Sequence, residues 1–204
     1  MLISLVMQFI FDAPDRWLYV VINQHLAFDF LDQIMVFLSS KWAMIPVYIW
    51  LICSFYQRSK KNILVWLLLC LLGFGLADSI SSRIFKPVFK RVRPAFEISL
   101  NPRLPGGMPG SKYGFVSSHS ANMFAVFGLS TMLLGLAGKQ KWGLMGLAGL
   151  VAYSRVYLGV HYPGDVIFGG LLGYGIAMLL FRLWKWLCTQ SPWMDKLENT
   201  IENN

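Results

Sequence analysis

Residues 62–82 have the sequence NILVWLLLCLLGFGLADSISS, which is apolar between its first residue and its short polar end. A helix needs about 20 apolar residues to cross a hydrocarbon core of about 30 Å, so this segment predicts a transmembrane helix. The composition agrees, because 56% of the 204 residues are hydrophobic and 14% are charged, whereas soluble domains have about 25% charged residues. We therefore expect an integral membrane protein. Abundant aromatic residues and a total of three cysteines exclude a disordered regulator and a disulfide scaffold.

Further apolar stretches of near-spanning length lie on both sides of 62–82. The stretch 42–57 contains Pro46 and reaches spanning length together with part of 28–41. The later stretches, rich in Gly, Ala and Ser, are 120–137, 142–160 and 164–183. Small residues let helices approach closely in lipid, where packing and hydrogen bonds drive their association. The predicted fold class is all-α, an integral membrane helical bundle with five to six transmembrane helices and amphipathic N-terminal helices.

We expect one domain, 1–204, whose catalytic bundle covers 41–185. Charged residues interrupt the apolar run of 1–40, which predicts interfacial helices or a partial span. The start of the chain lacks the basic region and cleavage site of a secretory signal, so we expect it to be retained. Segment 94–118 has four prolines and four glycines and is predicted as an extramembrane loop, because unpaired backbone is too costly in lipid. Residues 186–204 are predicted as a polar tail.

Five spans place alternate connections on opposite faces of the membrane. One face has 58–61, 139–141 and the segment after 182, and the other has 83–118 and 154–165. The first face carries seven Lys and Arg residues, at positions 58, 60, 61, 139, 141, 182 and 185. The second carries eight, at positions 83, 86, 90, 91, 93, 103, 112 and 155. The positive-inside count does not discriminate, but the second set belongs to a candidate site, so we place the first face in the cytoplasm.

Two of the three histidines, His119 and His161, lie on the second face at the ends of different spans. Four residues after His161 stands Asp165, with Pro163 between them. Proline favours the first position of a helix, which puts Asp165 in the first turn, near enough to accept a proton from the imidazole. A carboxylate partner makes a histidine a better base or nucleophile.

Cations suited to binding a phosphate share this face. Lys86 and Arg93 are seven residues apart, which on a helix is two turns and the same side. Arg155 stands six residues before His161. Arginine binds phosphate with two parallel N–H groups, and lysine adds a mobile point charge. A simple membrane anchor needs no such variety of groups.

Two serines, Ser117 and Ser118, immediately precede His119 at the predicted start of a helix. Helix N-termini present free N–H groups and the positive end of a dipole, which suits them to an anion such as phosphate. The alternative role for a serine at this place is that of a plain N-cap. A different polar residue, Asp78, lies near the end of the first span, where we expect a structural ion pair with Arg83.

Three blocks of residues together resemble the signature of the type 2 phosphatidic acid phosphatase superfamily, which includes membrane lipid phosphatases and vanadium haloperoxidases. The blocks are Lys86-x6-Arg93-Pro94, Val116-Ser117-Ser118-His119 and Ser154-Arg155-x5-His161-x3-Asp165. They follow the family's order, and the resemblance covers about residues 40–185. The family's middle block is usually Pro-Ser-Gly-His, so Val116 and Ser118 depart from it. Ser118 can still offer its backbone N–H to a phosphate if its side chain turns aside.

The resemblance implies a role for each of these residues. The phosphoryl oxygens would be bound by Lys86, Arg93, Arg155, the Ser117 hydroxyl and the Ser118 N–H. His161, oriented by Asp165, would attack phosphorus, and His119 would protonate the leaving oxygen and then activate water. The resemblance implies no metal and no cofactor. The sequence agrees, since no cluster of carboxylates, Cys or His has metal-ligand spacing.

The leading hypothesis is a membrane lipid phosphatase that removes the terminal phosphate of a lipid whose tail stays in the bilayer. Short bacterial members of the family suggest undecaprenyl diphosphate as substrate, with phosphatidylglycerophosphate, phosphatidic acid and lipid A phosphates as alternatives. A haloperoxidase is disfavoured by the spans. An alternative of another class is a non-enzymatic binder or transporter of anionic lipids, which would need the cations but not the His161 and Asp165 pair. We expect the bacterial inner membrane, an active site facing the periplasm, and no nucleic acid partner.

Overall fold

The computed structural model describes residues 13–58 and 60–190. All regular secondary structure in these residues is helical, which confirms the all-α prediction. The α-helices are α2 (Asp29–Leu38), α3 (Lys41–Arg58), α4 (Ile63–Ser79), α5 (Lys86–Phe89), α6 (Ser118–Leu133), α7 (Gly138–Tyr157) and α8 (Pro163–Gln190). The chain also turns in short helical segments, Val21–His25, Lys60–Asn62, Ile80–Phe85, Pro94–Phe96 and Ile98–Leu100. Residues 13–20 are helical as well.

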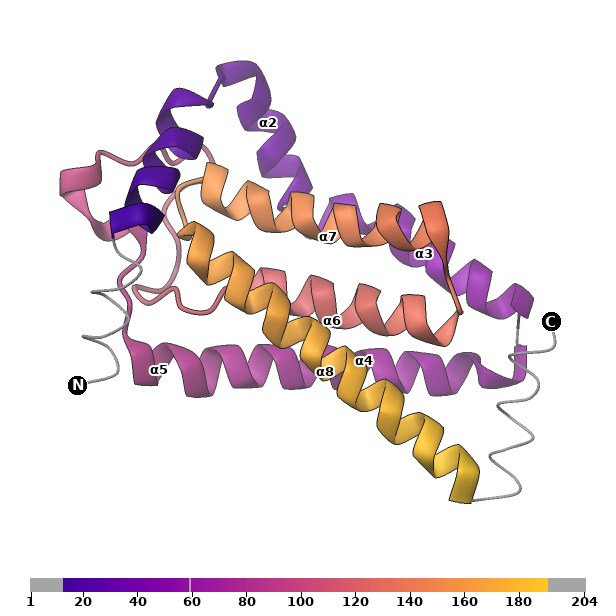
Figure 1. The fold of residues 1–204 in the computed structure, drawn as a ribbon. Helices are drawn as coiled ribbons and strands as arrows, with labels where there is room; N and C mark the ends of the chain where they lie inside the picture. Colours follow the sequence, from indigo (N-terminus) through magenta and orange to yellow (C-terminus); the bar gives the residue numbers. More distant parts are fainter. Residues whose placement is uncertain (1–12, 59, 191–204) are drawn as a thin grey trace.

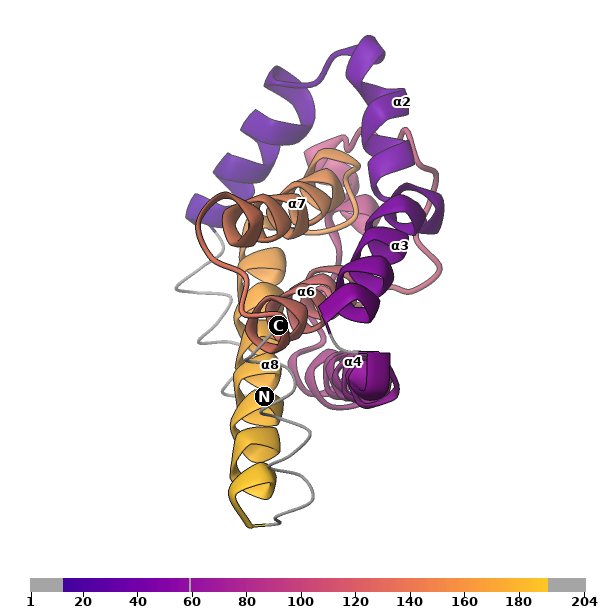
Figure 2. The same cartoon turned by 90° about the vertical axis from the view of Figure 1, so that its right-hand side faces the viewer.

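The long helices form a bundle in which neighbours in the chain run in opposite directions. Helices α3, α4, α6 and α7 lie side by side, and α8 lies across them (Figures 1 and 2). The α3–α4 and α6–α7 connections meet at one end, and the α5–α6 loop and the α7–α8 turn meet at the other (Figure 1). This is the alternation of connections that the sequence predicts. Helix α6 is central, because it packs against α4, α7 and α8.

Among the described residues, two helices are long and apolar enough to cross a membrane, namely the continuous helix Ile63–Phe89 and α8. Helices α2 and α3, bent by 50° at the break between them, pass the same test when taken together. Helix α6 has 16 residues and is about 24 Å long. Because it packs against α4, α7 and α8, its side chains do not all have to be apolar. The prediction of five to six spans stays a prediction.

Glycines bring α6 and α8 into close contact at the end of the bundle where both begin. A Cβ added to Gly169 would lie 2.6 Å from the carbonyl oxygen of Ser117, and one added to Gly173 would meet the carbonyl oxygen of Ala121. The Ser120 hydroxyl also donates to the Val166 carbonyl at 2.6 Å. Small residues thus place the start of α8 directly against the start of α6.

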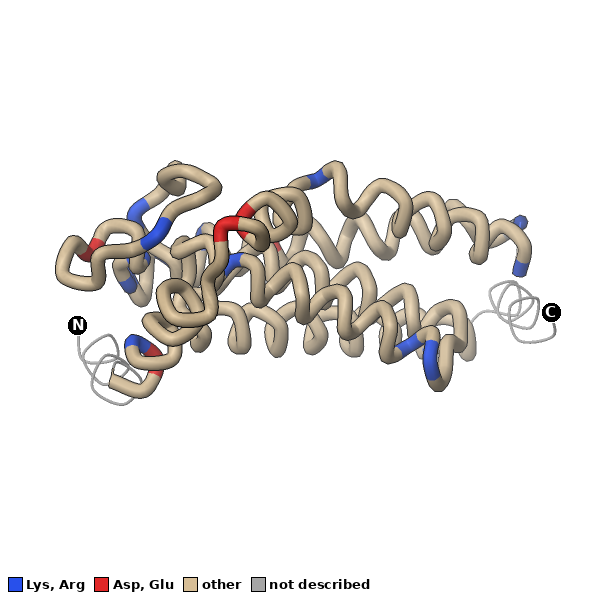
Figure 3. The backbone as a smooth tube through the Cα atoms, turned by 90° about the horizontal axis from the view of Figure 1, so that it is seen from above, with Lys and Arg blue, Asp and Glu red and all other residues tan. Residues whose placement is uncertain are grey.

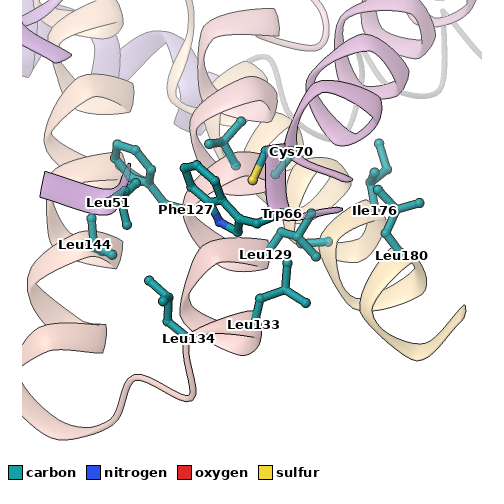
Figure 4. Packing of buried hydrophobic residues seen from close by; sticks show 14 of the residues in the cluster. Leu51, Trp66, Cys70, Phe127, Leu129, Leu133, Leu134, Leu144, Ile176 and Leu180 are labelled. Atoms are coloured by element: carbon teal, nitrogen blue, oxygen red, sulfur yellow. The ribbon is translucent and has the colours of Figure 1, made fainter. Parts of the chain in front are cut away.

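The centre of the bundle is an apolar core to which five helices contribute. Figure 4 shows Leu51 of α3, Trp66 of α4, Phe127 of α6, Leu144 of α7 and Leu180 of α8 within this cluster. All of them are at least 95% buried, so the helices enclose a packed interior that holds their ends in register.

Charged residues lie at the ends of the bundle. Figure 3 shows Lys and Arg at both ends and the described Asp and Glu residues gathered toward one of them. The end with both signs of charge is where the α5–α6 loop, the start of α6 and the α7–α8 turn come together. This is the face to which the sequence assigns the candidate site.

One sequence-based expectation is wrong in detail. Lys86 and Arg93 do not share a helix face, because α5 ends at Phe89 and Lys90 adopts a left-handed conformation with φ of 48°. Arg93 instead lies in extended backbone, and its N–H donates to the Lys112 carbonyl at 3.0 Å.

Helix α8 continues to Gln190, which lies within the predicted polar tail 186–204. The remainder of that tail lies outside the described residues.

Candidate active site

The structure gathers most of the predicted site residues around one cavity. The cavity has a volume of about 490 Å³, within the range of about 300–1,000 Å³ that is typical of ligand pockets. The predicted residues that line it are Lys86, Arg93, Ser118, His119, Arg155 and His161. The two other predicted residues, Ser117 and Asp165, are fully buried and do not line it. Segments up to 75 residues apart therefore converge as the three sequence blocks predict.

The buried pair of His161 and Asp165 has the predicted geometry. Helix α8 begins at Pro163, which puts Asp165 in its first turn. Nδ1 of His161 lies 3.3 Å from Oδ2 of Asp165, and the same oxygen accepts the N–H of Tyr162 at 3.1 Å. With Nδ1 directed at the carboxylate, Nε2 is the ring nitrogen left for the cavity. His161 is 2% exposed, so the surrounding protein holds its ring orientation.

An arginine of the second basic set, to which the sequence assigns no individual role, contacts this pair. Nη1 of Arg91 donates to Oδ1 of Asp165 at 2.9 Å, and Nη2 lies 2.6 Å from Oδ2 of Asp15. The guanidinium also lies over the Tyr162 ring, 4.2 Å from its centroid. Asp15 in turn accepts the N–H of Gly164 at 2.7 Å. A buried chain of alternating charges thus connects the N-terminal helical residues 13–20 to Asp165.

Ser117 and Ser118, at the start of α6, have different hydrogen-bond partners and therefore different roles. The Ser117 hydroxyl accepts the N–H of Ser120, at a long 3.5 Å, so its place is that of the N-cap. The Ser118 hydroxyl accepts from Nζ of Lys86 at 2.9 Å and lies 2.8 Å from the Ser81 hydroxyl. The side chain of Ser118 therefore turns aside, as its proposed phosphate-binding N–H requires. N–H groups in the first turn of a helix have no acceptor within that helix.

The two arginines of the cavity are held by different parts of the chain. Arg93 is 7% exposed and donates from Nε to the Tyr113 carbonyl at 3.2 Å and from Nη2 to the Ser111 hydroxyl at 3.0 Å. Arg155 donates to the hydroxyl of Ser39 at the break between α2 and α3. The α5–α6 loop and the α2–α3 break thus each position one guanidinium at the cavity.

The two histidines of the cavity differ in their surroundings. Burial lowers the pKa of His161 to about 4; Asp165 opposes this shift, and Arg93 and Arg155 add to it. His161 is therefore neutral at pH 7, with a lone pair on Nε2. His119 reaches the cavity surface, where a leaving group and water have access to it. Partial burial and the positive charge of Arg155 nevertheless lower its pKa to about 3, so His119 is also neutral at pH 7 before a phosphate binds.

Asp78 also lines this cavity. The expected ion pair with Arg83 is wrong, because neither side chain makes an ion pair within the described residues and Arg83 is exposed. Within 13–58 and 60–190, no group of three or more His, Cys, Asp or Glu side chains is placed to hold a metal ion.

Comparisons with known proteins agree with the family resemblance. Residues 63–188 match the model of the PAP2 superfamily, and all eight predicted site residues lie within this range. The chain is 30% identical to a lipid A 4'-phosphatase of Porphyromonas gingivalis, over 92% of this chain and 79% of that protein. It is 33% identical to an undecaprenyl-diphosphatase of Sulfolobus acidocaldarius, over 75% of this chain and 70% of that protein.

A solved structure has the same fold. The transmembrane PAP2-type phosphatidylglycerolphosphate phosphatase from Bacillus subtilis superposes with a TM-score of 0.64 and 24% identity, covering 88% of this chain and 90% of that one. The similarity therefore extends beyond the three blocks to the arrangement of the helices.

Proposed function

Because the chain belongs to the PAP2 superfamily and is a membrane lipid phosphatase, we propose that it works through a phosphohistidine on His161 and that its substrate is a lipid A-type lipid phosphate. The observation that carries the mechanism is the buried His161, which lies against Asp165 at a cavity lined by the three predicted phosphate-binding cations and by Lys41. A non-enzymatic binder would need the cations alone.

The proposed reaction has two steps. Nε2 of His161 attacks phosphorus, the bond from phosphorus to the ester oxygen breaks, and His119 gives its proton to the leaving oxygen. A water molecule, losing a proton to His119, then attacks the phosphohistidine and releases phosphate. Asp165 stabilises the positive charge that develops on the His161 ring. Charge on the transferring phosphoryl group is stabilised by Lys86, Arg93, Arg155 and the Ser118 N–H, whereas Ser117 acts through the helix start.

The substrate assignment draws on the relatives. The lipid A 4'-phosphatase of P. gingivalis aligns with nearly the whole chain. Undecaprenyl diphosphate, which the small size of the chain suggests, remains the second candidate and is favoured by the S. acidocaldarius relative. In either case the apolar side of the cavity, lined by Met44, Tyr48 and Phe74, suits the start of a lipid tail between α3 and α4. We keep the predicted orientation, with the cavity facing the periplasm of the bacterial inner membrane.

Phosphate release by detergent-purified protein with EDTA present tests the proposal. The panel contains lipid A, undecaprenyl diphosphate, phosphatidylglycerophosphate, phosphatidic acid and a soluble phosphomonoester. We expect metal-independent release, fastest from lipid A, because the tail and headgroup add binding that the soluble ester lacks. Faster release from undecaprenyl diphosphate would replace the substrate assignment, and a requirement for metal would contradict the mechanism.

The pH dependence follows from the lowered pKa of His161. Only neutral imidazole attacks, so active enzyme is lost as pH falls through a pKa of about 4. A phosphate monoester has a second pKa of about 6. As pH falls from about 6 to about 5, the logarithm of kcat/KM should therefore fall with a slope no steeper than one, since the pKa values of His161 and His119 in the free protein, about 4 and about 3, lie below this range. A slope of two would mean that His161 also titrates between about pH 5 and 6, which would contradict its lowered pKa. A bound phosphate neutralises the cations that lower the pKa of His119, so His119 takes up its proton in the complex. A kcat that still rises through about pH 9 would count against His119 as the acid.

A further inference from the structure

Two hydrogen-bonding side chains of the cavity have no part in the proposed reaction. Asn122 of α6 is 8% exposed, and its buried amide oxygen has no hydrogen-bond partner among the described residues. Asp78 of α4 lines the same cavity, is half-buried and makes no ion pair within 13–58 and 60–190, although its charge acts on Lys86. An unpaired buried acceptor such as the Asn122 amide oxygen costs free energy that a ligand donor can restore. Asn122 therefore indicates a binding function, and Asp78 adds a second acceptor in the same cavity.

The packing of α4 against α6 places these two residues opposite each other. The helices are antiparallel (Figure 1), with the Ser81 hydroxyl 2.8 Å from that of Ser118 at one end. Farther along, Sγ of Cys70 lies 3.7 Å from the Ser130 hydroxyl, so the register is kept over three turns. One turn before Ser81 comes Asp78, and one turn after Ser118 comes Asn122.

Their place in the cavity is on the side of the leaving group. Asn122 follows His119 by one turn on the same face of α6. His119 protonates the leaving oxygen in the proposed reaction, and α6 runs from there into the bundle (Figure 1). The atoms bonded to the leaving oxygen therefore pass Asn122 and Asp78 on their way to the lipid tail.

We propose that Asp78 and Asn122 form a headgroup subsite that accepts hydroxyl or amide N–H donors next to the scissile phosphate. The proposal rests on the proposed function and narrows its substrate class to lipids phosphorylated on a sugar or polyol. A carboxylate is an acceptor only, so it binds such donors and repels a second phosphate at the same place. The subsite thus selects a phosphorylated glycolipid over an isoprenoid diphosphate.

The test compares kcat/KM for lipid A with kcat/KM for undecaprenyl diphosphate in the same detergent. Wild type should prefer lipid A. Asp78→Asn keeps the shape of the side chain but removes its charge, so kcat/KM for undecaprenyl diphosphate should rise. The ratio of the two kcat/KM values, which favours lipid A in wild type, should then fall at least about tenfold. Asn122→Leu should lower the ratio by a similar factor, because kcat/KM for lipid A should fall. The matched control is Asp29→Asn, a fully exposed carboxylate outside the cavity, which should keep the wild-type ratio.

The outcomes separate this proposal from the function it rests on. If both rates fall together in Asp78→Asn and Asn122→Leu, the residues are structural and the subsite is overturned. A wild type that prefers undecaprenyl diphosphate also overturns it, while leaving the phosphatase mechanism intact. Absence of hydrolysis of every lipid by wild type would overturn the proposed function itself, and the subsite with it.

Discussion

Replacing His161 by alanine is expected to abolish phosphate release from every lipid phosphate, with kcat lowered at least about 10⁴-fold. In the proposed reaction the imidazole supplies the attacking nitrogen, and no other described histidine lies against Asp165. The measurement is release of radiolabelled phosphate by purified protein. A companion measurement is wild type quenched in alkaline detergent, in which a base-stable phosphoprotein should accumulate that is lost on acid treatment and is missing from the variant.

His25 provides the matched control, because it is exposed and does not line the cavity. His25→Ala should keep wild-type turnover. Binding of a lipid phosphate by His161→Ala should be largely retained, since the three cations remain. Equal loss of binding and hydrolysis would instead favour a structural role for His161, and residual turnover above about 1% of wild type would rule it out as the nucleophile.

The second large effect concerns the arginine between two buried carboxylates. Arg91→Met should lower kcat about 10- to 100-fold, the usual cost of losing a group that orients a catalytic side chain. It should also lower the free energy of unfolding by about 3–5 kcal/mol, because Asp15 and Asp165 lose their shared cation. KM should change little, since Arg91 does not line the cavity. The measurements are steady-state kinetics and thermal unfolding in detergent.

Two variants distinguish loss of the orientation of Asp165 and His161 from a general loss of folding stability. Arg91→Lys should recover part of kcat, because one ammonium can still reach one carboxylate. Arg83→Met removes an exposed arginine from the same region and should leave both kinetics and unfolding unchanged. A rise in KM with constant kcat in Arg91→Met would show that Arg91 acts on substrate binding instead of on His161.

The local parts of the fold and the site were readable from the sequence. Span length depends on a run of apolar residues, and a helix start depends on neighbours such as Ser117 and Pro163. The pairing of His161 with Asp165 is also local, since one turn of helix brings together residues four apart. The ends of those helices then predict that the polar residues of the three blocks lie on the same face of the bundle.

Long-range partners were not readable in the same way. Arg91 lies 76 residues after Asp15 and 74 residues before Asp165 in the chain. Nothing in the sequence around Arg91 distinguishes it from the exposed Lys90. Arg93 reaches the cavity through a left-handed residue and an extended segment, where a helical spacing argument fails.

Hydrophobic length and helical periodicity therefore indicate which segments form long apolar helices and which residues share a helix end, because both are properties of consecutive residues. The tertiary structure alone decides which ends meet and in what register. Gly169 and Gly173 set the register of α8 against α6. The contacts of Ser81 with Ser118 and of Cys70 with Ser130 set the register of α4 against α6, which places Asp78 opposite Asn122. Such contacts depend on the shapes of whole helices, and no short stretch of sequence contains them.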